Sequence, residues 1–116
     1  PIKGKLSSYF GWRGKYFHTG IDIVASRGTP VRASLDGKVI YSGWMRFYGY
    51  IVILDHGDGY TTRYAHNSQL LVRKGDYVKK GQTISKVGST GWATGPHLHF
   101  EIRKGGEALN PLSFLR

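Results

Sequence analysis

The sequence contains no cysteine, only seven acidic residues and no long apolar run. The absence of cysteine excludes a disulfide scaffold, a thiolate metal site and a cysteine nucleophile. No stretch approaches the roughly eighteen consecutive apolar residues that a membrane-spanning helix needs. Any metal chemistry must therefore use histidine and carboxylate side chains, and the chain has five histidines to combine with its seven acids.

Positive charge, in contrast, is abundant. Seventeen Lys and Arg against seven Asp and Glu give a net charge of +10. This charge serves solubility or favours a polyanionic partner, and nucleic acid, anionic lipid and anionic cell-wall polymers all fit it. The chain starts at Pro1 without a charged-then-apolar leader, so we expect an excised or processed domain.

The 116 residues, 40% of them hydrophobic, predict a single small domain over 1–116 with one core. No helical stripe of ten or more residues is present, whereas short β-branched and apolar runs recur between glycines. We expect strands over 31–35, 38–42, 50–55, 60–65, 83–87 and 98–103, a hairpin joining the first two, another joining 50–55 to 60–65, and at most a helical turn over 68–71. The prediction is an all-β fold, with an antiparallel sheet curled into a barrel- or sandwich-like body.

Two histidines lie close together near the C-terminus. Because residues two apart in a strand face the same way, His97 and His99 share one face, and Leu98 and Phe100 share the other. An imidazole pair of this kind is a recurring half of a metal site, although it is also compatible with two solvated strand residues. Glu101 shares the imidazole face, either as a hydrogen-bond acceptor behind the metal or, as we favour, as an ordinary charge at the end of the strand.

The other histidines are weaker signals when taken singly. His18 and Asp22 are four residues apart, but Gly20 and the β-branched neighbours favour a bend into a strand over a helix. Taken alone, His66 is expected to be a polar residue at the end of a strand. His56 lies in a hairpin turn and is expected to be solvated and to have no functional role. Together, two histidines and one carboxylate would make a zinc site with a fourth position open to water, leaving two histidines for proton transfer. Spacing does not assign which histidines bind the metal and which transfer protons.

A series of motifs covers nearly the whole chain in one order. They are Ser-Tyr-Phe-Gly-Trp-Arg (8–13), His-Thr-Gly-Ile-Asp-Ile (18–23), Gly-Thr-Pro-Val (28–31), Asp-His-Gly-Asp-Gly-Tyr (55–60), Tyr-Ala-His (64–66), Val-Lys-Lys-Gly-Gln (78–82), Gly-Ser-Thr-Gly (88–91), Thr-Gly-Pro-His-Leu-His-Phe-Glu (94–101) and Asn-Pro-Leu (110–112). In this order the motifs resemble the lysostaphin-type, or LytM-like, zinc endopeptidases that trim bacterial peptidoglycan.

The resemblance implies a role for each candidate residue. His18, Asp22 and His99 would be the ligands of one Zn²⁺ per domain, and His66 and His97 would be the unliganded catalytic pair. It also implies a β-rich sheet curled around a substrate groove.

The chain departs from the family at a few positions near this groove. Asn67 and Trp92 replace commoner residue types and are expected to border the groove. The segment 14–17 is shorter than in many relatives, which predicts an open cleft. Aromatic residues in glycine-rich loops are candidates for the groove walls: Trp12, Tyr16, Trp44, Phe47, Tyr48 and Trp92.

These features predict a zinc metalloendopeptidase that hydrolyses peptidoglycan crosslinks, with the D-alanyl crosslink of stem peptides preferred over a glycyl-glycine bridge. A non-catalytic wall-binding or amidase-activating domain is the alternative from another class, and the intact His66 and His97 argue against it. A basic nucleic-acid-binding barrel would leave the ordered His and Asp set unexplained. We therefore expect peptidoglycan as partner, no nucleic acid, and an extracytoplasmic location, while the oligomeric state stays open.

Overall fold

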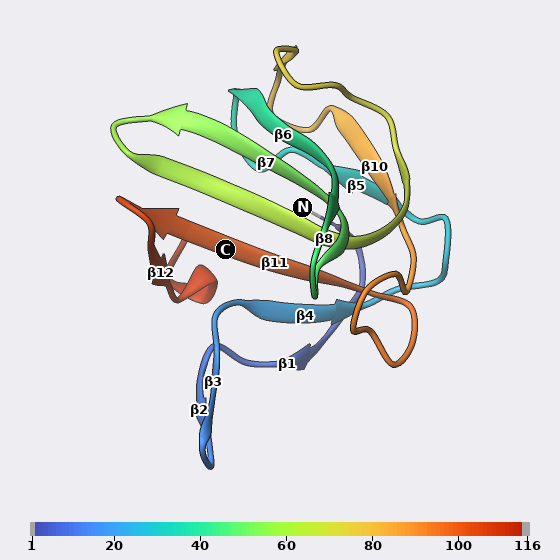
Figure 1. Ribbon diagram of the computed structural model, residues 1–116, viewed down its shortest axis with the longest axis vertical. Helices are drawn as coiled ribbons and strands as arrows, with labels where there is room; N and C mark the ends of the chain where they lie inside the picture. The colour runs from blue at the N-terminus through green and yellow to red at the C-terminus, as the bar shows by residue number, and fades with distance from the viewer. Residues whose placement is uncertain (1, 115–116) are drawn as a thin grey trace.

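The computed structural model describes residues 2–114, and nearly every regular element in it is a strand (Figure 1). The elements are β1 (Lys5–Ser8), β2 (Gly11–Arg13), β3 (Tyr16–His18), β4 (Ile21–Val24), β5 (Pro30–Arg32), β6 (Gly37–Met45), β7 (Gly49–Gly57), β8 (Tyr60–Leu70), β9 (Tyr77–Val78), β10 (Thr83–Val87), β11 (His97–Lys104), β12 (Glu107–Leu109) and the 3-10 helix η1 (Pro111–Ser113). No helix within residues 2–114 is long and apolar enough to cross a membrane.

The main sheet is antiparallel and follows the order β1-β4-β11-β8-β7-β6-β9. The long strand β8 curls it, because its first half pairs with β11 and its last residues pair with β10 instead. Strand β10 also pairs with β5, and β2 with β3 forms a separate hairpin that extends from one end of the molecule in Figure 1. The predicted all-β, curled antiparallel fold is confirmed, and among the described strands the sheet stays open.

The hairpin predicted between 31–35 and 38–42 is wrong. Strand β5 pairs with β10, while β6 pairs with β7 and β9. The residues after β5 are held by the segment before β10, since Ala33 N donates to Gln82 O at 2.9 Å and Gly81 N donates to Ala33 O at 2.8 Å. Lys80 N also donates to the Asp36 carboxylate at 2.7 Å. The chain between β5 and β6 is therefore held against the segment before β10 and does not form the tight turn of a hairpin.

The helical turn predicted over 68–71 is also wrong, because β8 continues to Leu70. Pairing with β10 extends the strand: Leu71 N donates to Ile84 O at 2.9 Å, and Ser68 Oγ donates to Val87 O at 2.8 Å. The second predicted hairpin, from β7 to β8, is confirmed.

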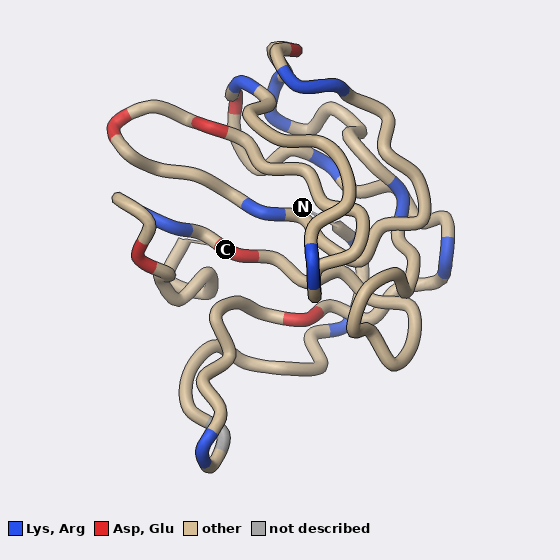
Figure 2. The backbone as a smooth tube through the Cα atoms, viewed as in Figure 1, with Lys and Arg blue, Asp and Glu red and all other residues tan. Residues whose placement is uncertain are grey.

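The core lies on one face of the curled sheet, where alternate residues of the long strands meet. Leu54, Tyr64, Leu98 and Phe100 are fully buried there. The same alternation turns the intervening residues of β11 to the opposite face, as the sequence predicts. Charge is spread widely around this body, and Figure 2 shows many more Lys and Arg positions than acidic ones along the backbone.

Candidate metal centre

The corner between β3 and β4 places two of the predicted metal ligands beside β11. Strand β3 ends at His18, and β4 carries Asp22 directly opposite His99 in the antiparallel pairing. Gly20 makes this close approach possible, because a Cβ at that position would lie 2.2 Å from Phe100 O. Any side chain there would push the corner off β11 and separate the three residues.

His18, Asp22 and His99 form a compact group in which one ligand atom from each residue lies within 4.8 Å of the others. His18 Nε2 is 3.3 Å from Asp22 Oδ2, and His99 Nδ1 is 2.9 Å from Asp22 Oδ1. Two imidazole nitrogens with one carboxylate oxygen are a donor set that suits zinc and leaves a fourth position open. These three residues therefore fit the metal that the sequence predicts.

The remaining nitrogen of each of these histidines is fixed by a hydrogen bond. His18 Nδ1 donates to Tyr9 O at 2.9 Å, which directs Nε2 at Asp22. His99 Nε2 donates to Glu101 Oε2 at 2.8 Å, which turns Nδ1 toward Asp22. Such outer partners set the tautomer and orientation of metal-binding imidazoles, so the two rings are oriented for a shared ion.

Glu101 is fully buried, and the interpretation of it as an ordinary charge at the strand end is wrong. Its Oε2 accepts hydrogen bonds from Thr19 Oγ1 at 2.8 Å and Tyr48 Oη at 2.9 Å besides that from His99, and its Oε1 accepts one from Arg103. Burial alone would raise the pKa of Glu101, but the hydrogen bonds, that from His99 foremost, lower it to about 2. Glu101 is thus an ionised anchor for the His99 ring.

Two carboxylates also control the protonation of His99. Burial alone would lower the pKa of His99, but hydrogen bonds to Asp22 and Glu101 raise it to about 9. Burial would raise the pKa of Asp22, yet hydrogen bonds with His18 and His99 hold it well below its usual range. Without an ion, a proton on His99 therefore balances the carboxylates, and a bound cation would take the place of that proton.

His66 reaches the same face through an irregularity in β8. Tyr50 pairs with Asn67 and Val52 pairs with Tyr64, so two residues of β8 lie opposite the single residue Ile51. This is a β-bulge, and His66 occupies it with a left-handed φ of 66°. Ala65 lies on the cleft face, so regular alternation would place His66 on the core face. The bulge instead turns His66 toward the cleft, beside His97 and His99.

Backbone hydrogen bonds hold the His66 ring in the cleft. His66 Nδ1 donates to Thr90 O at 2.6 Å, and His66 N donates to Tyr48 O at 2.8 Å. Burial lowers the pKa of His66 to about 4, in spite of the hydrogen bond to Thr90. Near neutral pH the ring is therefore uncharged, with Nε2 available as a proton acceptor.

His97 is held in a similar way. Its Nδ1 donates to Gly95 O at 2.9 Å, and its Nε2 lies 3.7 Å from Asp22 Oδ1. The rings of His97 and His66 are neighbours, with centroids 4.9 Å apart. All five predicted site residues therefore meet in one place, with the two additional histidines beside the His18-Asp22-His99 group.

The five residues line a cleft of about 600 Å³. The other lining residues are Tyr16, Phe17, Thr19, Phe47, Tyr48, Trp92 and Thr94. Four of the six candidate aromatic residues, Trp92 among them, are thus in the walls. Trp12 and Trp44 do not line the cleft, and the prediction that Asn67 borders it is wrong. Asn67 is fully buried, and its Nδ2 donates to Tyr50 O and Tyr64 O across the β8 bulge.

One wall of the cleft is joined to the loop before β11 by close backbone packing. Trp92 N donates to Phe47 O at 3.0 Å, and the two rings meet edge to face with centroids 4.3 Å apart. Gly49 and Gly91 make the approach possible, since a Cβ on Gly49 would lie 2.6 Å from Gly91 N and one on Gly91 would lie 2.5 Å from Gly49 N. The same contact places Thr90, the partner of His66.

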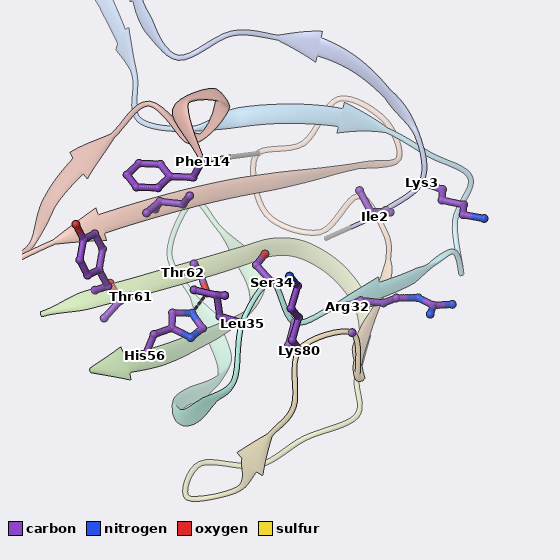
Figure 3. A pocket seen from close by; sticks show the side chains of 14 residues that line it. Ile2, Lys3, Arg32, Ser34, Leu35, His56, Thr61, Thr62, Lys80 and Phe114 are labelled. Carbon is purple, nitrogen blue, oxygen red and sulfur yellow. Dashed lines mark hydrogen bonds between the residues drawn. The ribbon is translucent and has the colours of Figure 1, made fainter. Parts of the chain in front are cut away.

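A second cavity, of about 880 Å³, lies on the core side of the sheet and contains none of the five residues (Figure 3). His56 is in its wall, where Nδ1 donates to Asp36 O at 2.8 Å and Nε2 lies 2.7 Å from Thr62 Oγ1. His56 is therefore half-buried and bonded through both nitrogens, so the expectation of a solvated histidine is wrong. His56 lies outside the His18-Asp22-His99 group.

The structure thus combines a curled antiparallel sheet with a His-Asp-His group in a cleft. The chain belongs to peptidase family M23, which it matches over residues 16–111. This family membership confirms the resemblance to the LytM-like proteins.

Two curated relatives illustrate the similarity. The chain is 44% identical over 116 residues to the murein hydrolase activator NlpD of Escherichia coli (strain K12), covering 99% of this chain and 30% of the relative. It is 45% identical over 115 residues to the DD-carboxypeptidase/endopeptidase Mpg of Neisseria meningitidis serogroup B (strain MC58), covering 94% of this chain and 26% of the relative. The chain thus spans less than a third of either protein.

Solved structures agree with the fold. The antimicrobial peptidase lysostaphin from Staphylococcus simulans superposes with a TM-score of 0.89 at 37% identity, over 97% of this chain and 49% of that one. The catalytic domain of a mutant of the prophage-encoded M23 protein EnpA from Enterococcus faecalis superposes with a TM-score of 0.85 at 38% identity, over 97% of this chain and 92% of that one.

Proposed function

We propose that this domain is a zinc-dependent endopeptidase that hydrolyses peptide crosslinks of bacterial peptidoglycan, in particular the D-alanyl crosslink of stem peptides. The observation that carries the proposal is the convergence of two kinds of histidine in one cleft. His18 and His99 share Asp22 as a metal group, while His66 and His97 keep one nitrogen on a backbone carbonyl and present the other beside that group.

In this proposal the ligands are His18 Nε2, His99 Nδ1 and an Asp22 carboxylate oxygen. When bound, zinc supplies a Lewis acid that polarises the scissile carbonyl and makes a water nucleophilic near neutral pH. Glu101 keeps the His99 ring in the orientation that offers Nδ1, through the hydrogen bond at Nε2.

His66 and His97 handle protons in this proposal. The neutral His66 is ready to accept a proton at Nε2, and either ring can take the proton of the attacking water or deliver one to the leaving amine. The hydrogen bonds to Thr90 O and Gly95 O fix both rings, so each Nε2 is aimed before the substrate arrives. One positioned acid or base contributes roughly 10² to 10⁴ in rate.

The choice of bond and of location rests on the relatives and on charge. The similarity to a protein named DD-carboxypeptidase/endopeptidase supports the D-alanyl crosslink over a glycyl-glycine bridge. Peptidoglycan carries carboxylates, and a domain of charge +10 concentrates on such a polymer by an attraction that salt weakens. This substrate implies an extracytoplasmic location.

A second candidate function is activation of another murein hydrolase, favoured by the similarity to a protein named murein hydrolase activator. In that case the cleft would bind without turnover. The presence of both His66 and His97, each anchored and directed into the cleft, supports catalysis instead.

Digestion of purified peptidoglycan by this domain alone, with and without a zinc chelator, tests the proposal. Fragments are identified by mass spectrometry, and we expect chelator-sensitive release of split D-alanyl crosslinks. A parallel reaction contains a peptidoglycan amidase. If the zinc-loaded domain releases nothing by itself but accelerates the amidase, the activator function replaces the endopeptidase function.

A further inference from the structure

The face of the sheet that carries the metal group continues past His99 along β8 and β11. In the antiparallel register His99 lies opposite Ala65, and Glu101 lies opposite Arg63. Directly opposed residues point to the same face, so Arg63 and Glu101 lie on the cleft face, two residues beyond His99. Two residues of a strand span roughly 7 Å, which is about the span of two residues of an extended peptide.

Positive charge exceeds negative charge at this point. The buried Glu101 carboxylate receives a hydrogen bond from Arg103 Nε at 2.7 Å, whereas Arg63 Nε lies 3.9 Å from the same oxygen. Arg103 is also bonded to Gly106 O at 3.0 Å. One carboxylate thus faces two guanidinium groups, and Arg103 holds the hydrogen bond.

One donor group of Arg63 lacks a hydrogen-bond acceptor in the part of the chain that the structure describes. Among residues 2–114 its buried Nε finds no such partner, although buried N–H groups in proteins normally have one. Its guanidinium lies against the ring of Tyr48, 5.6 Å from the ring centre, and 24% of the side chain is exposed. Tyr48 itself lines the cleft and contacts the His99 ring, so Arg63 lies next to a residue of the cleft wall, although it is not itself among the lining residues.

We propose that Arg63 is a specificity-determining residue that binds a carboxylate of the peptide substrate beside Tyr48. The proposal rests on the proposed function and adds the substrate chemistry: a peptide with a free carboxylate about two residues from the scissile bond. A planar guanidinium offers paired N–H donors that match a carboxylate, and the excess positive charge at Glu101 favours an anion over a carboxamide.

A structural role for Arg63 makes a different prediction. If Arg63 only packs against Tyr48 and balances Glu101, its loss would disturb the cleft for every ligand alike. If Arg63 binds a carboxylate, its loss would weaken only ligands that carry one. Comparison of two ligands that differ at the carboxylate therefore separates the two roles.

The experiment uses a crosslinked muropeptide dimer with free carboxylates and the same dimer with those carboxylates amidated. Binding is measured by calorimetry on the zinc-loaded His97→Ala protein, so that turnover does not consume the ligand, with and without Arg63→Gln. We expect Arg63→Gln to weaken binding of the carboxylate dimer by about 10- to 100-fold, the range for charged hydrogen bonds, and to leave the amidated dimer unchanged. Arg32→Gln, which removes the same charge from the side of the second cavity, is the matched control and should change neither affinity.

Equal weakening of both dimers, or of neither, overturns the proposal. Should Arg63→Gln fail to fold, Arg63→Lys keeps the charge and the aliphatic stem but loses the paired donors, and it should bind the carboxylate dimer more weakly than Arg63 does. The carboxylate preference is measured by binding, so it does not depend on turnover. If the domain with His97 intact cuts neither dimer, the proposed endopeptidase function is wrong, but the carboxylate preference still stands.

Discussion

The two faces of the sheet hold histidines in different ways. In the cavity on the core side, both ring nitrogens of His56 have partners, Asp36 O and Thr62 Oγ1. In the cleft, His66 and His97 each give Nδ1 to a backbone carbonyl and turn Nε2 toward the cleft, where His97 Nε2 lies 3.7 Å from Asp22 Oδ1. All three rings are at least half-buried, so exposure does not distinguish them.

The difference teaches that the partner of the second nitrogen decides what a buried histidine can do. The ring of His56 is bonded to a backbone carbonyl and to a hydroxyl, and neither partner is a metal ligand. His99 is also bonded at both nitrogens, but its Nδ1 partner is Asp22, a residue of the metal group, so an ion shared with Asp22 could take the place of that contact. An imidazole bonded at one nitrogen is oriented and still reactive. Each of the following predictions breaks or sharpens this contrast.

The largest effect is expected from removing a ligand of the metal group. His18→Ala and Asp22→Ala, like His99→Ala, should lose zinc and more than about 10⁴-fold in turnover, because the electrophile and the nucleophile disappear together. Metal content by mass spectrometry and release of crosslink fragments measure the two losses. A folded Asp22→Ala protein with a full equivalent of zinc would contradict the assignment.

The next effect concerns His66 and His97, the two histidines held by a backbone carbonyl. His66→Ala and His97→Ala should keep zinc and lose roughly 10²- to 10⁴-fold in turnover, since each removes one proton-transfer group. Steady-state digestion of a crosslinked muropeptide, together with metal content, checks both. A metal-free His97→Ala protein would make His97 a ligand and overturn this division of roles.

A smaller effect is expected behind the metal group. Glu101→Gln removes the charge that holds His99 Nε2 and should lower zinc affinity by about 10- to 100-fold, the usual range for such outer partners. Competition with a coloured chelator measures the affinity. Glu107→Gln, at an exposed position of β12, is the matched control and should leave zinc affinity unchanged.

The smallest effect is expected on the other face. His56→Gln should lower the free energy of unfolding by about 1–2 kcal/mol, because it disturbs two hydrogen bonds of modest net value. Urea denaturation measures this change, and zinc content and turnover should stay at the level of the unchanged protein. Loss of zinc in this variant would mean that the two faces are coupled.

Strand periodicity was sufficient to predict the β11 side of the site. Alternation alone places His97 and His99 opposite Leu98 and Phe100, and the structure confirms it. The grouping of all five site residues came from the motif order, because residues as distant as His18 and His99 are joined only through sheet pairing. Local spacing contains no information on that pairing.

Three features lay beyond what the sequence could predict. The bulge at His66 depends on the change of pairing partner of β8 from β11 to β10, and regular alternation alone would place His66 on the core face of the sheet. The pairing of β5 with β10 overrides a strong turn signal at Asp36-Gly37. Glu101 resembles a surface charge in the sequence, because two of its four hydrogen-bond partners, Thr19 and Tyr48, come from distant segments.

The bulge in β8 also divides the site into two separable halves. The metal group comes from the β3–β4 corner and β11, whereas His66 is aimed by one surplus residue in a strand that supplies none of the ligands. Deleting a single residue there would restore plain alternation and rotate the following positions by half a turn. A related domain could thus keep the metal ion and all its histidines and still lose catalysis, because a one-residue deletion in β8 would turn His66 away from the cleft.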